Sequence, residues 1–456
     1  MKTVVPTLSL LASFLFAAFA FAAAEKSPPA FAQPIELEDG DRFVFLGDSI
    51  THQCLYTQYV ETYFYTRYPE RRIHFRNAGV SGDVASDALL RFDEDVADFE
   101  PDYVSVLLGM NDGRYRHFEH EVFARYEQGM EALLGRIGTR AEAIPMGPSY
   151  FDTRAVRMSE QAARWVKTRE AMRDYYPSVL AFYSEWLAEQ AQLAGVNFVD
   201  MATPMRRLSF EQRRVDPSFT FAKDAVHPEP KGHVVMAAAM LADAFQIEPV
   251  SEISLTLDRK GRIESSSASG KLENLVAKKG RIRFDYTSSG LPWVLPHAAH
   301  EGYELAKAGE RFSQDLLRVV GLKAGVYELK IDLVPIARFT AGELEVGVDL
   351  QGYSQAPQYK QAMEVALLNK DRNEQAIKPL RDQWLHRKSR LRKEEAWLTE
   401  NPEHPDFESR KSRFDADMQA FYRKLEELEA LALEFEDKIY EANQVPARSY
   451  VLSPAE

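Results

Sequence analysis

Short apolar runs alternate with stretches of helical periodicity across residues 42–249, and this alternation predicts one parallel α/β fold. The expected strands are 43–46, 72–77, 103–108, 141–147 and 196–200. Parallel neighbours need crossover connections, so strands that alternate with helices favour a sheet covered on both faces. If the strand order is the flavodoxin-like one, 2-1-3-4-5, the topological switch point lies between the first and third strands.

The pattern changes after residue 250. Apolar and polar residues alternate in several short runs over 250–350, which predicts an antiparallel β module. Residues 351–456 become helical and charged, and apolar residues recur with 4-3 spacing from Phe414 to Ile439. This spacing is typical of a helical hairpin or coiled coil, with 359–398, divided near Pro379, as the other helical stretch. The seam is expected to pack within the chain, with a homodimer as the alternative.

The first residues have the layout of a secretory signal peptide. Lys2 precedes an apolar run over 4–24 that ends in small residues before Glu25. We therefore expect a signal peptide over 1–24, a linker over 25–41, and a secreted or periplasmic protein. Because the run is about 20 residues long, retention as a membrane anchor is the alternative.

Charge and cysteine content exclude several partners and sites. The chain has 456 residues and a net charge of -13, which argues against nucleic acid or an anionic membrane as the main partner. Its single cysteine, Cys54, excludes an intrachain disulfide and a cysteine-based metal cage, and core packing is its expected role. No glycine-rich phosphate loop follows a strand, and the histidine pairs 117/120 and 297/300 lack further ligands. We expect no cofactor and no metal.

Three strand exits carry residues suited to acyl transfer. Ser49 follows the first strand, where it is either a presented nucleophile or a helix cap. The glycine-containing turn at Gly82 follows the second strand and either exposes N–H groups to an oxyanion or simply turns the chain. Asn111 follows the third strand as an amide donor or an ordinary turn residue. The predicted topology brings the exits of the first and third strands to one crevice.

A later loop offers a base. Pro228 favours an extended conformation at His227, and Asp224 lies three residues before that histidine. The carboxylate can fold back onto one imidazole nitrogen and leave the other for Ser49, although a solvated loop would have the same sequence.

Other polar residues near these blocks are candidates for lining a substrate pocket. His52 lies on the helix after Ser49 and either lines the pocket or has a structural role. Asp112 and Arg114 follow the third strand and either contact a polar substrate or belong to a solvated loop.

Taken together, four blocks resemble those of the SGNH/GDSL hydrolases. They are Gly47-Asp48-Ser49-Ile50, the Gly82 turn, Gly109-Met110-Asn111-Asp112 and Asp224-Ala225-Val226-His227. The resemblance covers about 42–246, with every functional position present. It implies a flavodoxin-like three-layer α/β/α sandwich over 42–249 and hydrolysis of carboxylic esters without a metal.

The resemblance also implies a role for each matching residue. Ser49 would be the nucleophile, His227 the general base and Asp224 the group that holds the imidazole tautomer. The N–H groups of Ser49 and Gly82 and the amide of Asn111 would form the oxyanion hole.

The resulting hypothesis is a secreted serine esterase that acts on short-chain, most plausibly acetyl, esters of carbohydrates, because export points to external substrates. The alternatives are a lipase or lysophospholipase, and a non-catalytic carbohydrate-binding or assembly protein on a disused esterase fold. The intact triad argues against the last. The β module would bind carbohydrate or cover the cleft, and Trp293 would contact a ligand or pack.

Overall fold

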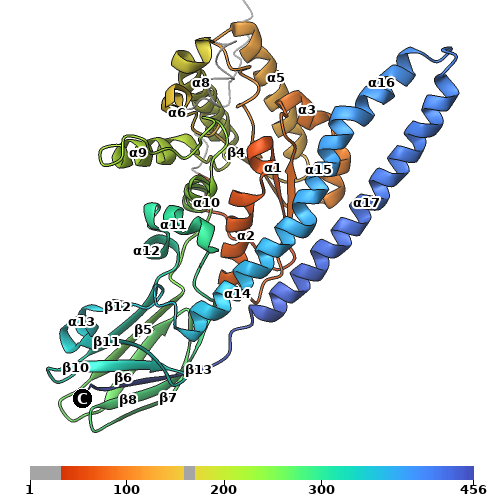
Figure 1. Ribbon diagram of the computed structural model, residues 1–456. Helices are drawn as coiled ribbons and strands as arrows, with labels where there is room; N and C mark the ends of the chain where they lie inside the picture. Colours follow the sequence, from red (N-terminus) through yellow and green to blue (C-terminus); the bar gives the residue numbers. More distant parts are fainter. Residues whose placement is uncertain (1–31, 159–169, 456) are drawn as a thin grey trace, which may run out of the picture.

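The structure is a computed structural model that describes residues 32–158 and 170–455. Figure 1 shows an α/β part, a β module at one end, and a long helical hairpin that lies along the α/β part. The predicted signal segment at 1–24 lies outside the described residues. Within them, no helix is both long and apolar enough to cross a membrane.

The α/β part is built on a parallel sheet, which confirms the predicted fold class. The strands are β1 (Arg42–Gly47), β2 (His74–Gly79), β3 (Tyr103–Leu107) and β4 (Glu142–Met146), in the order β2-β1-β3-β4. The connection from β1 to β2 runs in the opposite direction to the later ones. Right-handed crossovers therefore place helices on both faces of the sheet.

The predicted fifth strand is reduced to one parallel bridge, between Met146 and Val199. The N–H of Val199 donates to the carbonyl of Pro145 (3.0 Å), and the N–H of Gly147 donates to the carbonyl of Val199 (2.9 Å). The next bridge would need an N–H on Pro145, which proline lacks. The ladder therefore ends after one step.

Helices pack in pairs around this sheet. Helix α2 (Leu55–Arg67) lies beside α10 (Pro230–Ala244), and α3 (Ala85–Leu90) lies beside α5 (His120–Ile137). Helix α8 (Glu170–Ala194) packs against β4. The shorter elements of this part are α1 (Ser49–His52), α4 (Phe92–Asp95), η1 (Ala97–Phe99), α6 (Thr153–Met158) and α9 (Ala202–Gln212).

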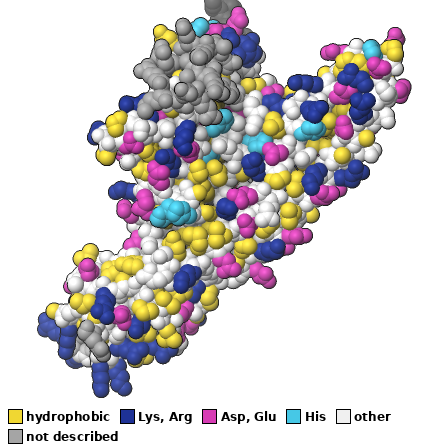
Figure 2. Space-filling model, in the orientation of Figure 1, with side chains coloured by type: hydrophobic (Ala, Val, Ile, Leu, Met, Phe, Trp, Pro, Cys, Tyr) yellow, Lys and Arg dark blue, Asp and Glu magenta, His cyan; other side chains and the backbone are white. Residues whose placement is uncertain are grey.

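The hairpin consists of a segmented helical rod and one long returning helix. The rod comprises α14 (Pro357–Arg372), the π turn η3 (Asn373–Ile377), α15 (Lys378–His386), the π turn η4 (Arg387–Leu391) and α16 (Arg392–Glu400). The returning helix is α17 (Phe407–Ala442). In Figure 2, acidic and basic side chains are mixed along the visible face of this hairpin.

Two details of the hairpin bear on the prediction. The rod is divided near Pro379, as predicted: the π turn η3 ends at Ile377, and Pro379 occupies the first turn of α15, where a missing N–H is tolerated. The apolar seam of α17 is buried within the chain, with Phe421 and Leu428 clustered against Trp384 of α15. The homodimer stays a prediction.

The β module consists of two sheets, in the orders β11-β10-β13-β8-β7 and β12-β9-β5-β6. The pair β5–β9 is parallel, so the expected all-antiparallel arrangement is wrong at that pair. The strands are β5 (Ser251–Leu257), β6 (Ile263–Ala268), β7 (Gly270–Lys278), β8 (Arg281–Ser288), β9 (Asp315–Val320), β10 (Val326–Ile331), β11 (Val334–Thr340), β12 (Val348–Asp349) and β13 (Arg448–Pro454).

Strand β13 shows that 351–456 is not wholly a helical tail. It pairs with both β10 and β8, in the middle of its sheet. Tyr450 and Leu452 are buried in the core of the module, and Val451 between them is also buried. The chain therefore returns to complete a sheet begun about 170 residues earlier, a pairing that local sequence does not indicate.

The segment between β8 and β9 joins the module to the α/β part. It contains η2 (His297–Ala299), α11 (His300–Leu305) and α12 (Ala308–Phe312), and α11 packs on α10. Trp293 is fully buried, and its indole N–H donates to the carbonyl of Tyr59 on α2 (3.0 Å). Trp293 is thus a packing residue and not a ligand contact. One further helix, α13 (Ala341–Val346), follows β11.

Burial of β13 predicts a large difference between two leucines of the same module. Leu452 is 1% exposed and Leu333, in the β10–β11 turn, is 84% exposed. Leu452→Ala should lower the free energy of unfolding of the module by about 3 kcal/mol through lost burial and a residual cavity. Leu333→Ala should change it by less than about 0.5 kcal/mol. Denaturant unfolding of the full chain measures both, and equal effects would contradict a central position for β13.

Candidate active site

Ser49 is presented at the carboxyl end of β1 and is half-buried. The N-cap of α1 is Asp48, whose carboxylate accepts the N–H of Ile50 (3.0 Å). Asp48 therefore takes the capping role, and the hydroxyl of Ser49 is left for other contacts. Gly47 permits this tight turn, because a Cβ there would lie 2.1 Å from the hydroxyl oxygen of Thr51.

Asp224, His227 and Ser49 form a continuous chain of hydrogen bonds. Asp224 Oδ2 lies 2.7 Å from His227 Nδ1, and His227 Nε2 lies 2.8 Å from Ser49 Oγ. The ionised carboxylate accepts a hydrogen bond from the N–H at Nδ1. Nε2 is therefore unprotonated and accepts a hydrogen bond from the Ser49 hydroxyl. The structure thus brings these three predicted residues together.

The loop holds Asp224 firmly. Its Oδ1 accepts the N–H groups of Val226 (3.0 Å) and His227 (2.8 Å). Ala225 between them has φ +75, a left-handed conformation that is uncommon for alanine. Its own N–H and C=O are both bonded, to the carbonyl of Ala222 and the N–H of Asp152. This reversal of the chain lets one carboxylate bind both the backbone and the imidazole of His227.

Burial and charge set the ionisation of this pair in opposite senses. Burial alone would lower the pKa of His227, but the hydrogen bond and charge of Asp224 and the charge of Asp48 outweigh it and raise the pKa above 6.5. Burial would raise the pKa of Asp224, but the donors of His227 and Val226 keep it below 3.8. Asp224 is therefore ionised at neutral pH, and it favours the imidazolium that forms when His227 accepts a proton.

The two other predicted oxyanion donors lie at the exits of β2 and β3. Gly82 has φ +75, and its backbone N–H donates to no acceptor within the described residues. The side-chain amide of Asn111 donates to the carbonyl of Asp83 (3.0 Å) and lies 3.3 Å from Asp48. These contacts bring Asn111, the Gly82 turn and the Ser49 turn to one edge of the sheet.

Two of the three expected pocket-lining residues have other roles. His52 is buried, and its Nδ1 accepts the N–H of Ser81 (3.3 Å) in the Gly82 turn. Asp112 is also buried, where its carboxylate accepts the N–H groups of Ala85 (2.9 Å) and Gly109 (3.0 Å), and burial raises its pKa to about 7. Both side chains point into the protein and hold neighbouring loops through backbone N–H groups. Arg114 is exposed, and its role stays a prediction.

Sequence reasoning missed the residues that support this edge from a distance. Arg91 binds Asp83 through a 2.7 Å ion pair, and Lys388 of the hairpin binds the same carboxylate at 2.8 Å. His233 of α10 accepts the N–H of Tyr56 (3.3 Å) and contacts Gln53 (3.2 Å). Burial lowers the pKa of His233 to about 3, so it is neutral. No local motif marks these contacts, which join segments far apart in the sequence.

Two observations concern the cysteine and the possible metal ligands among the described residues. Cys54 is buried, as expected for a packing residue, and burial raises the pKa of its thiol to about 12. Over residues 32–158 and 170–455, no group of three or more histidine, cysteine or acidic side chains is arranged to hold a metal ion.

The raised pKa of His227 predicts an effect of Asp224 that proton NMR can measure. Asp224→Asn removes the charge that raises this pKa, so the His227 imidazole should lose its proton at a lower pH than in the native chain. Asp216→Asn, an exposed change eight residues earlier, should leave the His227 titration unchanged. The resonance is assigned from its loss in His227→Ala. A titration of His227 that does not move in Asp224→Asn would contradict the ion pair.

Comparison with known proteins shows similarity to one hydrolase family. Residues 45–235 match the GDSL-like lipase/acylhydrolase family. An acetylxylan esterase from Geobacillus stearothermophilus is 25% identical over 232 residues, which is 46% of this chain and 96% of that protein. A solved structure of that organism's acetylxylan esterase, Axe2, has a TM-score of 0.36 at 24% identity, covering 46% of this chain and 95% of its own.

A second solved structure is similar over nearly the whole chain. It is a gut microbial diltiazem-metabolizing enzyme, 25% identical, with a TM-score of 0.78 over 93% of this chain and 100% of its own. The shared arrangement therefore includes the β module and the hairpin. The chain therefore contains an SGNH/GDSL hydrolase domain over residues 45–235, and this domain and these relatives support a carboxylic ester hydrolase.

Proposed function

We propose that Ser49, His227 and Asp224 are the catalytic triad of an exported esterase that removes acetyl groups from carbohydrates. The observation that carries the catalytic part is the unbroken chain of hydrogen bonds from Asp224 through His227 to Ser49, at 2.7 and 2.8 Å. A serine hydroxyl is a weak nucleophile until a neighbouring base accepts its proton, and this arrangement supplies that base.

The reaction proceeds in two steps. Ser49 Oγ attacks the acyl carbon while His227 Nε2 takes the hydroxyl proton, and the carbonyl oxygen becomes an oxyanion. When the tetrahedral intermediate collapses, His227 returns the proton to the departing alcohol and an acyl-Ser49 remains. His227 then deprotonates a water that attacks this acyl group, and the carboxylate product leaves.

We assign three donors to the oxyanion. The N–H of Ser49 is the first of helix α1, so it has no acceptor within the helix. The N–H of Gly82 and the amide of Asn111 come from the neighbouring strand exits. Donors held in place before the reaction stabilise the developing charge without reorganisation, which is the largest contribution in many acyl transfers.

Three observations favour acetylated carbohydrate as the substrate. A curated relative that matches 46% of this chain is an acetylxylan esterase. The apolar run at 4–24 favours export to where polysaccharides are found. The net charge of -13 is compatible with a neutral polymer and unfavourable for anionic lipid surfaces.

Loss of the nucleophile tests the catalytic assignment. Ser49→Ala should reduce the kcat on p-nitrophenyl acetate by about 10³-fold or more, because attack through an acyl-enzyme is lost. Ser218→Ala, a change at an exposed serine of the loop before Asp224, is the matched control and should leave kcat unchanged. Equal turnover by the native chain and Ser49→Ala would discard the triad.

Acyl length and polymer identity test the substrate. The native chain should release acetate from acetylated xylan, and kcat/KM on p-nitrophenyl esters should fall from acetate to decanoate. A preference for decanoate, or for phospholipid over acetylated xylan, would replace the carbohydrate substrate with a lipid while leaving the triad intact.

A further inference from the structure

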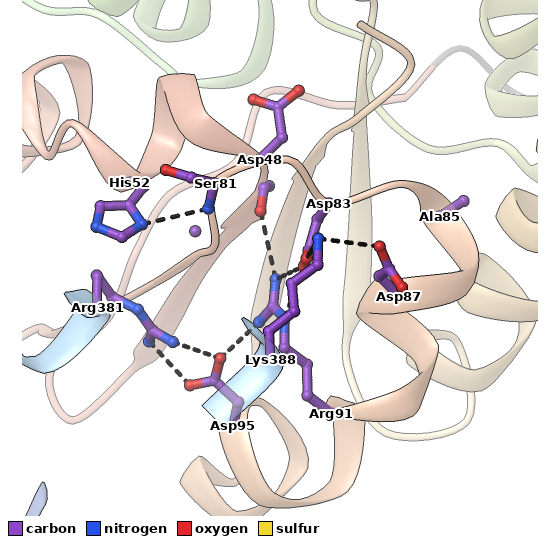
Figure 3. A network of polar contacts seen from close by, with 12 residues as sticks. Asp48, His52, Ser81, Asp83, Ala85, Asp87, Arg91, Asp95, Arg381 and Lys388 are labelled. Atoms are coloured by element: carbon purple, nitrogen blue, oxygen red, sulfur yellow. Dashed lines mark hydrogen bonds and ion pairs between the residues drawn. The ribbon is translucent and has the colours of Figure 1, made fainter. Parts of the chain in front are cut away.

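The rod of the hairpin touches the turn that carries the candidate oxyanion donor Gly82. Lys388 Nζ lies 2.8 Å from Asp83 Oδ1 and 3.0 Å from Asp87 Oδ2. It is also the nearest group to the position of a Cβ on Gly82, at 3.9 Å. Figure 3 shows Lys388 reaching both carboxylates from the neighbouring helix. A cation from the rod of the hairpin is thus held beside Gly82.

A second contact reaches the same turn from α15. Asp382 Oδ1 lies 3.0 Å from His52 Nε2, and His52 Nδ1 accepts the N–H of Ser81, beside Gly82. Because Nδ1 is an acceptor, neutral His52 carries its proton on Nε2 and donates it to Asp382. Burial lowers the pKa of His52, which favours this neutral form. Asp382 therefore fixes the tautomer that lets His52 hold the backbone of the turn.

A third connection runs through buried charges. The two terminal nitrogens of the Arg381 guanidinium, Nη1 and Nη2, donate to the two carboxylate oxygens of Asp95, at 2.9 and 2.6 Å. Arg91 joins Asp95 (2.5 Å) to Asp83 (2.7 Å) and also contacts the carbonyl of Gly47 (3.3 Å). Figure 3 shows this alternation of positive and negative side chains. It links α15 to the turns before Ser49 and after Gly82.

Asp83 is where these connections meet the reaction centre. Its carboxylate accepts Arg91 and Lys388, while its carbonyl accepts the amide of Asn111 (3.0 Å). Two of the three candidate oxyanion donors, Gly82 and Asn111, therefore depend on the position of this one residue.

The local helix geometry supports a specific role for Lys388. It lies in the π turn η4, where one extra residue in the turn changes the direction of the side chains that follow. Such turns are rare in helices and are frequently found at functional sites. In this rod the turn coincides with the residue that contacts the Gly82 turn.

We propose that the helical hairpin is a working part of the active site, in which Lys388 and Asp382 are positioning residues that hold the Gly82 turn in its oxyanion-binding geometry. The inference rests on the proposed function, since it assigns a supporting role to residues around the Ser49 reaction. Both residues act through others, Lys388 through Asp83 and Asp382 through His52.

Substitution of Lys388 tests the proposal in the full-length chain. Lys388→Met keeps the length of the side chain but removes its charge, and it should lower kcat on p-nitrophenyl acetate about 10- to 100-fold, because displaced donors weaken oxyanion binding. KM should change by less than about twofold, since these donors act chiefly in the transition state. Lys388→Arg should restore most of the activity. Lys393→Met, at an exposed lysine five residues later, should equal the native chain.

A double-mutant cycle separates positioning from general destabilisation. Asp83→Asn should lower kcat, and adding Lys388→Met to Asp83→Asn should cost little more, because Lys388 acts through the Asp83 carboxylate. Asp382→Ala, at a half-exposed side chain that folding tolerates, should lower kcat about fivefold with KM unchanged. Thermal unfolding of each variant shows whether the fold is kept.

The outcomes distinguish this proposal from the one on which it rests. If Ser49→Ala equals the native chain, the proposed function is wrong. If activity depends on Ser49 but Lys388→Met and Asp382→Ala both keep native kcat, the hairpin only covers the sheet and the positioning role is overturned. A rise in KM at constant kcat would also overturn it, because it would assign these residues to substrate binding.

Discussion

The position of β1 between β2 and β3 is the constraint on which the site depends. Gly47, the last residue of β1, is in register with Gly79 of β2 and Leu107 of β3. Neighbouring strands lie about 4.8 Å apart, so the three following loops emerge side by side. Ser49, Gly82 and Asn111 each lie within a few residues of these exits. Only the imidazole comes from elsewhere, on a loop fixed by the Asp224 carboxylate and the start of α10.

Buried carboxylates below this edge fall into two kinds. Asp83 and Asp95 are partnered by lysine or arginine, whereas Asp48 and Asp112 accept N–H groups and form no ion pair with lysine or arginine in the part of the chain that the structure describes. Burial raises the pKa of both Asp48 and Asp112 to about 7. The charge of Asp48 helps to raise the pKa of His227, after the larger effects of burial and of Asp224. Below neutral pH, protonation of His227 removes the general base. Protonation of Asp48 removes one of the negative charges that raise the pKa of His227.

Sequence was sufficient where chemistry depends on a strand and the turn that follows it. Ser49, Asn111 and the Asp224–His227 loop are local patterns, and parallel topology brings them together. Prediction from sequence failed where a contact with a distant segment decides the structure. Strand β13 joins a sheet formed by residues far earlier in the chain, and the Asp112 carboxylate accepts backbone N–H groups and does not line the pocket. The fifth strand shows a subtler limit. Its residues favour a strand, but Pro145 on the neighbouring strand removes the donor that a longer ladder needs.

The buried charges also explain why the hairpin docks in one register. Arg381 and Asp95 are both fully buried, and removing such ions from water costs several kcal/mol each. Two parallel hydrogen bonds and the neighbouring Arg91 offset that cost only when the side chains meet in this geometry. Sliding the rod by one residue would separate the buried Arg381 guanidinium from the Asp95 carboxylate and turn Trp384 away from Phe421. Apolar contacts therefore bring the hairpin to the sheet, and the ion pairs select the alignment in which Lys388 reaches Asp83.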